Sequence, residues 1–139
     1  MALDKDKIHK VIRDFYKVAT TDFLIGYQFR KIAEFQSANP LSPPIEAFDH
    51  HIPRIVSFWE LQLNGKMSTP NEKPFNLINA HEYLSMRKGE IGRWVTLFNQ
   101  TLDKYIVENE LSKEELSTTD IWRERVDLFQ KKFLEGRIL

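Results

Sequence analysis

Apolar residues recur every three or four positions along most of this chain, which is the spacing of amphipathic helices. The pattern predicts a first helix over residues 5–19, with Tyr16 on its inward side. Asp22 then predicts a cap for a short helical segment that reaches Phe29. A long helix is expected after Gly89. No stretch alternates like a strand between hairpin turns, so the pattern predicts an all-α fold of four main helices and at least two short ones.

The last predicted helix is expected to begin within 117–120, where Ser, Thr and Asp are candidate caps. Its apolar positions are Ile121, Trp122, Val126, Phe129 and Phe133. We expect Trp122 and Phe133, together with Trp59 of an earlier helix, to belong to the core.

The stretch from about Pro44 to Leu63 predicts a helix with more apolar surface than one buried face needs. One stripe consists of Phe48, Ile52, Val56, Trp59 and Leu63, and a second of His51, Ile55 and Phe58. Such a helix has to be covered on two sides, either by protein alone or by protein and a flat apolar ligand. Pro53 removes one backbone N–H and is expected to bend its axis.

Polar stretches rich in Pro, Ser and Asn predict loops over 36–44 and 64–75, and the 76–84 segment between the second loop and the next helix is short and helix-compatible. The 139 residues, of which 42% are hydrophobic and 12% aromatic, fit one domain over 1–139. We expect a cytoplasmic protein, because neither a signal peptide nor a membrane-spanning run is present.

Charge and cysteine content narrow the chemistry. Lys+Arg and Asp+Glu number 20 each, so there is no basic footprint for nucleic acid or an anionic membrane. The absence of Cys removes disulfides, thiolate ligands and covalent haem attachment. No zinc-site spacing, nucleophile elbow, phosphate loop or dinucleotide fingerprint occurs. Any metal would therefore be bound by His or by carboxylates.

Three blocks of the sequence carry a family resemblance. The first, DFYKVATTDFLIGYQF over 14–29, resembles the opening of truncated haemoglobins. Tyr16 falls at the position of the family's distal tyrosine. Phe29 falls at the position of a phenylalanine that packs on the haem edge.

The second block, HIPRIVSFWELQLNGK over 51–66, resembles the E helix of the third group of truncated haemoglobins. The resemblance implies that His51 faces the distal pocket and that Ile55 and Phe58 contact the haem. It also implies that Arg54 meets a haem propionate, whereas we expect Arg87, Lys88 and Arg93 to form a solvated face.

The third block, AHEYLSMRKGEIGRWVTLF over 80–98, matches the family pattern around the proximal histidine. The resemblance implies that His81 is the iron ligand, that Met86 contacts the haem and that Trp94 is the distal tryptophan. We expect the second ring nitrogen of His81 to donate its N–H in a hydrogen bond to a backbone carbonyl near Leu77.

Taken together, the resemblance implies a truncated, two-over-two globin that holds haem b noncovalently and binds O2, NO and CO. Tyr16 O–H and Trp94 N–H would donate to an oxygen ligand that gains negative charge on binding. His51 could also close onto the iron when no gas is bound.

Several alternatives stay open at this point. The chain could turn over substrate as a nitric oxide dioxygenase or peroxidase served by a separate reductase. It could act as a sensor or interaction domain without turnover, or be a helical bundle without cofactor. We expect a monomer or a weak homo-oligomer.

Overall fold

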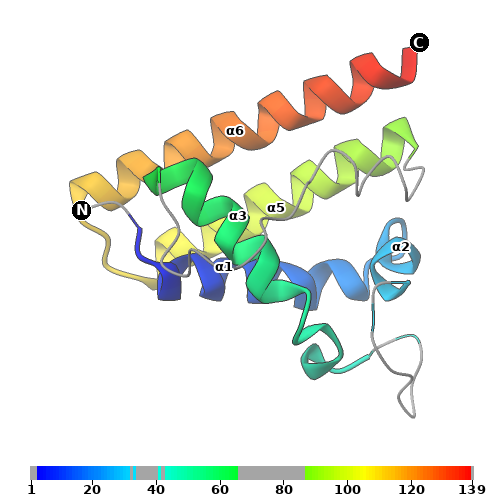
Figure 1. Cartoon of the computed structure of the whole chain (residues 1–139), viewed down its shortest axis with the longest axis horizontal. Coiled ribbons are helices and arrows are strands. Elements are labelled where there is room, and N and C mark those ends of the chain that lie inside the picture. Colours follow the sequence, from blue (N-terminus) through cyan, green and yellow to red (C-terminus); the bar gives the residue numbers. More distant parts are fainter. Residues whose placement is uncertain (1–2, 32, 34–40, 42, 66–86, 139) are drawn as a thin grey trace.

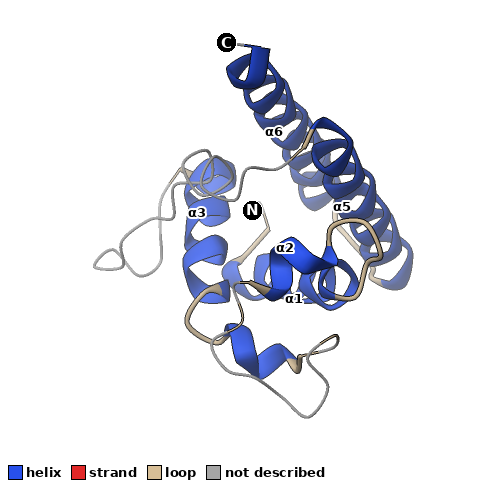
Figure 2. Cartoon of the chain, turned by 90° about the vertical axis from the view of Figure 1, so that its right-hand side faces the viewer, coloured by secondary structure: helices blue, strands red, loops and turns tan. Residues whose placement is uncertain are grey.

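A computed structural model describes residues 3–31, 33, 41, 43–65 and 87–138 (Figure 1). All regular elements in these ranges are helices, so the described part confirms the all-α class (Figure 2). The elements are α1 (Lys5–Thr20), α2 (Gly26–Arg30), the 3-10 helix η1 (Ile45–Phe48), α3 (Ile52–Asn64), α5 (Lys88–Glu108) and α6 (Lys113–Ile138).

Helix α1 lies at the centre of the packing and contacts α2, α3 and α5. Helices α5 and α6 run side by side in opposite directions, and α3 crosses α1 (Figure 1). In the described ranges, no helix has the length and apolar content needed to cross a bilayer.

The predicted first helix is confirmed as α1. Asp4 caps it by accepting a hydrogen bond from the backbone N–H of Lys7 at 2.9 Å. The residues buried along it are Ile8, Val11, Ile12, Phe15, Tyr16, Ala19 and Thr20. Because these positions form one helical face, α1 buries that face and leaves its charged side in water.

The single helix predicted to begin near Pro44 is wrong in its first turns. The structure has η1 there and begins α3 only at Ile52, so that Pro53 lies in the first turn of α3. A proline in the first turn removes no intrahelical hydrogen bond, because those N–H groups have no partner within the helix. Pro53 therefore helps to start α3 instead of bending it.

Most positions of the two predicted stripes are buried, and Leu63 at the end of the first stripe is half-buried. Phe48, Ile52, Val56 and Trp59 are buried, and of the second stripe Ile55 and Phe58 are buried while His51 is half-buried. The Phe58 ring contacts Phe129 of α6 at 5.6 Å between centroids. Protein therefore covers at least part of the second stripe.

The predicted start of the last helix is also wrong. Helix α6 begins at Lys113, and Ser112 and Glu115 form a reciprocal capping pair with N···O distances of 3.0 and 3.1 Å. Thr118 and Thr119 lie inside the helix and donate their hydroxyls to the carbonyls of Glu114 and Leu116. The S-x-x-E pattern at 112–115 was the signal that sequence reasoning missed.

The earlier start of α6 still leaves its predicted core largely in place. Trp122 and Val126 are buried, Phe129 packs partly against the core, and the Phe133 side chain lies outside the described residues. Ile121, expected on the apolar stripe, is exposed instead. Trp59 and Trp122 pack together with ring centroids 5.7 Å apart, which confirms both as core residues.

Helix α5 confirms the long helix expected after Gly89, although it starts one residue before that glycine. Glu90 accepts a hydrogen bond from the backbone N–H of Arg87 at 2.8 Å and so satisfies one donor at the helix start. The buried positions of its apolar face include Ile91, Trp94, Phe98, Leu102 and Tyr105.

Candidate functional site

Tyr16 lies where α1, α2 and the start of α3 meet. It is 5% exposed, and its ring contacts Phe29 and Phe48 edge-on, with centroids 5.3 and 5.4 Å apart. Phe15, the preceding residue, also contacts it edge-on at 6.1 Å. Edge-to-face packing of this kind holds an aromatic ring in one orientation. The Tyr16 hydroxyl is therefore held at a defined place inside the protein.

The structure joins that hydroxyl to His51. The Nε2 atom of His51 lies 2.8 Å from the Tyr16 oxygen, within hydrogen-bond distance. His51 is the N-cap residue of α3 but makes no side-chain capping bond there. Its ring is thus directed at Tyr16 and not at the helix terminus.

Burial raises the pKa of Tyr16 above its ordinary value, because the low-dielectric surroundings disfavour the phenolate. The group therefore stays a neutral hydroxyl through the physiological range. A neutral phenol can accept one hydrogen bond and donate another at the same time.

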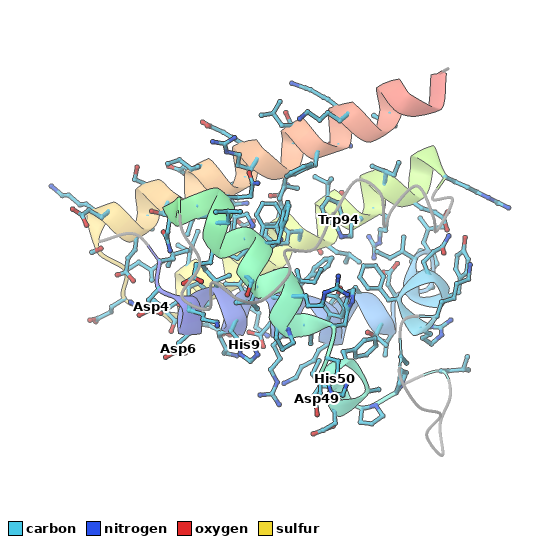
Figure 3. All side chains as sticks on the ribbon, in the orientation of Figure 1. Asp4, Asp6, His9, Asp49, His50 and Trp94 are labelled. Atoms are coloured by element: carbon cyan, nitrogen blue, oxygen red, sulfur yellow. The ribbon has the colours of Figure 1, made fainter. Side chains whose placement is uncertain are left out.

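Trp94 is carried by α5 (Figure 3), and its side chain is buried, with 5% exposed. Its ring packs edge-on against Phe15 with centroids 6.2 Å apart and lies nearly parallel to Phe98 one turn later. Phe15 also packs against Phe29 at 5.7 Å. Phe15 of α1 therefore contacts both Trp94 and the aromatic rings of Tyr16 and Phe29.

The sequence resemblance gave Phe15 no part in the site. Phe15 and Tyr16 both belong to the buried face of α1, but apolar periodicity does not tell which helix packs against each of them. Only the packing of α2 and α5 on α1 makes Phe15 the shared neighbour.

The other predicted site residues on α3 are divided by exposure. Ile55 is buried one turn after His51, and Phe58 is buried a turn further on. Arg54 is exposed on the outer side of the helix. His81 and Met86, the predicted proximal residues, lie outside the described residues, as does Leu77. The predictions for those three residues stay predictions.

Arg93 departs from the solvated face on which we expected it. Its guanidinium binds Asp22 Oδ1 in an ion pair, with the shorter N···O distance at 2.7 Å. One turn earlier, Glu90 accepts a hydrogen bond from the Tyr27 hydroxyl. These contacts join residues 63 and 71 positions apart in the sequence, and no local pattern indicates them.

Burial and hydrogen bonding compete at these two carboxylates. Desolvation opposes ionisation of Asp22 and of Glu90, but the hydrogen bonds that each accepts outweigh it and lower both pKa values. For Asp22 these bonds come from Arg93 and from the backbone N–H groups of Ile25 and Leu24. Both side chains are therefore ionised at neutral pH.

A separate hollow of about 380 Å³ lies on the surface between α1 and α5, and it contains none of the predicted site residues. Its rim carries the ion pairs Lys10–Asp14 and Lys104–Glu108. Because these charges are satisfied by each other in an open setting, they supply no organised binding chemistry.

No protein-family model, curated protein or solved structure matches this chain in comparisons with known proteins.

Proposed function

We propose that this chain is a haem protein of the truncated-globin type that binds diatomic gases. The observation that carries the proposal is the contact between buried Tyr16 and half-buried His51, with Trp94 of α5 packed on Phe15, the neighbour of Tyr16. The Tyr16 phenol of α1 and the His51 imidazole at the start of α3 thus lie within hydrogen-bond distance of each other, and Phe15 connects the Trp94 indole of α5 to the Tyr16 ring. The sequence resemblance assigns distal roles to Tyr16, His51 and Trp94.

The donors present fit the distal side of a haem. A phenol O–H, an imidazole N–H and an indole N–H can each donate to a small electronegative ligand. Phe29, Ile55 and Phe58 are apolar and buried, and they belong to the sequence blocks that resemble the family. Apolar side chains of this kind suit contact with a flat hydrophobic macrocycle. The proposed iron ligand is His81, with Met86 also on the haem and Arg54 as the propionate contact.

His51 determines how Tyr16 is used. When the His51 ring carries its proton on Nε2, it donates to the Tyr16 oxygen, and the phenol proton is then available for another acceptor. When Nε2 is unprotonated, it accepts the phenol proton instead. His51 therefore orients the Tyr16 hydroxyl, and Trp94 contributes a second donor from α5.

Haem b, held without a covalent bond, would supply the iron to which the gas binds and any redox chemistry. The protein would bind the cofactor and exclude water with the aromatic rings around Tyr16, which are Phe15, Phe29 and Phe48. Tyr16 and Trp94 would donate hydrogen bonds to the charge on the bound gas. The arrangement of α1, α3, α5 and α6 is proposed to be the two-over-two sandwich of the truncated globins. A cytoplasmic location, a single domain and a monomeric or weakly associating state complete the proposal.

The first prediction is that the purified full chain takes up one equivalent of hemin and develops a Soret band. His81→Gly should weaken haem retention, because it removes the proposed axial ligand, and added imidazole should restore part of the spectrum. The measurements are absorption spectra of the ferric, ferrous and ferrous-carbonyl forms.

His50→Ala is the matched control, because His50 is exposed at the start of α3 (Figure 3) and should leave haem uptake unchanged. His51→Ala should also retain haem. A chain that shows no Soret band after hemin titration would disprove the proposal. Loss of haem in His51→Ala but not in His81→Gly would mean that the two faces are exchanged.

Turnover of nitric oxide or peroxide with an added reductase would identify the enzyme alternative. Gas binding without turnover is the outcome expected of the sensor alternative. Both uses would require the same haem site.

A further inference from the structure

Two contacts join the first turns of α5 to the corner between α1 and α2. Arg93 donates to Asp22 Oδ1 from Nε at 3.1 Å and from a terminal nitrogen at 2.7 Å. One turn earlier on α5, Glu90 accepts a hydrogen bond from the Tyr27 hydroxyl. We refer to these contacts, Asp22–Arg93 and Tyr27–Glu90, as the corner clasp.

The acceptors of the corner clasp are themselves fixed. The Asp22 side chain is 4% exposed, and its second oxygen accepts hydrogen bonds from the backbone N–H groups of Leu24 and Ile25 at 3.0 and 3.1 Å. Glu90 is 3% exposed and also binds the N–H of Arg87. Each carboxylate therefore accepts hydrogen bonds from backbone N–H groups near it in the sequence and from a side chain of another element. Charge-assisted bonds of this kind are directional and stronger than neutral ones.

The outer side of the ion pair is partly covered by Phe23. The Arg93 guanidinium lies 5.5 Å from the centre of the Phe23 ring, although that ring is itself 90% exposed. The guanidinium is thus held between a carboxylate on one side and an aromatic face on the other.

Trp94 directly follows Arg93 and lies four residues after Glu90. Anchors three residues apart lie on neighbouring positions of one helix face, so together they fix the rotation of α5 about its axis. That rotation sets the direction in which the Trp94 side chain leaves the helix. In the structure it leads to Phe15, the neighbour of Tyr16.

We propose that Arg93 and Asp22 are positioning residues that set where the Trp94 indole lies relative to the Tyr16 hydroxyl. The consequence for gas binding rests on the proposed function. The placement of Trp94, however, can be measured in the full chain without haem.

The first measurement is the indole N–H signal of Trp94 in a 1H–15N NMR spectrum of the haem-free chain. Three tryptophans give three such signals, and Trp94→Phe assigns the relevant one. Arg93→Gln and Asp22→Asn should both shift the Trp94 signal while the signals of Trp59 and Trp122 stay in place.

Arg123→Gln is the matched control. It removes the contacts of Arg123 of α6 with Asn99 and Asp103 of α5, which lie five and nine residues after Trp94 along the helix. This variant should leave the Trp94 signal unchanged. Arg93→Lys keeps the charge but loses the two-point contact, so a partial shift is expected, and it carries the test if Arg93→Gln does not fold.

The second measurement is oxygen release from the haem-loaded chain. Arg93→Gln should speed release about fivefold, the factor that one ordinary hydrogen bond contributes, and should add little in a Trp94→Phe background. An unchanged Trp94 signal, an equal shift in Arg123→Gln, or full additivity with Trp94→Phe would overturn the proposal. Failure of haem uptake would disprove the proposed function alone, because the NMR result decides the placement independently.

Discussion

Tyr16 is an amphipathic side chain, with an apolar ring and a polar hydroxyl that have different surroundings. It is enclosed by Phe29 and Phe48, yet its oxygen retains a polar partner in His51 at 2.8 Å. Burial keeps the phenol protonated by raising its pKa. The result is a hydrogen-bonding group held rigidly in an apolar setting, where electrostatic interactions are stronger than in water.

The second prediction concerns this donor and its proposed companion. Tyr16→Phe and Trp94→Phe should each speed oxygen release while keeping an aromatic ring in place. A bond of about 1 kcal/mol corresponds to roughly fivefold, and a buried, charge-assisted bond of about 2–3 kcal/mol to roughly 30- to 150-fold. Stopped-flow dissociation from the two single variants and the double variant measures the effect.

Carbon monoxide provides the control for that experiment, because it carries less negative charge when bound and its release should change much less. The double variant should be non-additive, since both donors would serve one ligand. Equal acceleration for both gases would instead assign these residues a steric role. No change for either gas would leave them as packing residues.

At the scale of elements, the approach of α2 to the end of α1 depends on Gly26. A Cβ atom added there would lie 2.8 Å from the Thr20 carbonyl oxygen and 2.6 Å from the Arg30 guanidinium. Arg30 also donates to that carbonyl at 2.9 Å. The glycine therefore allows α2 to pack close enough for Arg30 to satisfy a carbonyl at the C-terminus of α1.

The third prediction is that Gly26→Ala destabilises the protein by about 1–3 kcal/mol, because the backbone of Thr20 has to move. Gly92→Ala is the matched control. Nothing lies within 4 Å of a Cβ at Gly92, which is inside α5, so alanine there should stabilise by about 0.5–1 kcal/mol. Urea unfolding of the haem-free proteins measures both. An unchanged free energy of unfolding in Gly26→Ala would mean that the backbone where α1 meets α2 can shift without loss of stability.

At the scale of the whole molecule, carboxylates connect helices that are far apart in the sequence. Glu115 at the start of α6 forms an ion pair with Lys7 of α1. Its hydrogen bonds to Lys7 and to the Ser112 backbone lower the pKa of Glu115 from 4.5 to about 2. Asp22 and Glu90 tie the α1–α2 corner to α5 in the same way, and their pKa values are also lowered.

The fourth prediction follows from the sign of these shifts. A carboxylate with a lowered pKa in the folded state stabilises the protein above its unfolded pKa, and that contribution is lost as the pH falls. For Glu115 the loss should occur between pH 4.5 and about 2. Glu115→Gln should therefore be less stable than the parent at pH 7 and should lose less stability across this window, so that the two curves converge near pH 2.

Thermal unfolding followed by circular dichroism over pH 2–7 measures these curves. Glutamine at 115 can still accept the Ser112 hydrogen bond, so the capping of α6 is retained. Asp127→Asn, which removes an exposed pair with Lys131 within α6, is the control and should run parallel to the parent curve. A Glu115→Gln curve parallel to the parent would mean that the Lys7 contact does not contribute to acid stability.

The sequence alone determined much of the secondary structure. The periodic apolar face of α1 predicted that helix to within one residue, and that of α5 predicted a long helix starting within two residues of the observed start, because burial of one face requires a repeat of 3.6 residues. The errors concern helix starts. The η1 break before Pro53 and the capping pair Ser112–Glu115 depend on hydrogen bonds at helix ends, which apolar periodicity does not report.

For the candidate site too, the sequence indicated some features, and only the tertiary structure decided the others. The residue types at Tyr16, His51 and Trp94 could be selected from the sequence through the family resemblance. Their meeting could not, because the 2.8 Å contact between Tyr16 and His51 spans 35 positions and exists only when α3 crosses α1. The corner clasp of Asp22 with Arg93 has no sequence signal at all. Local periodicity encodes which face of each helix is buried, whereas the packing of helices against one another decides which buried groups become partners.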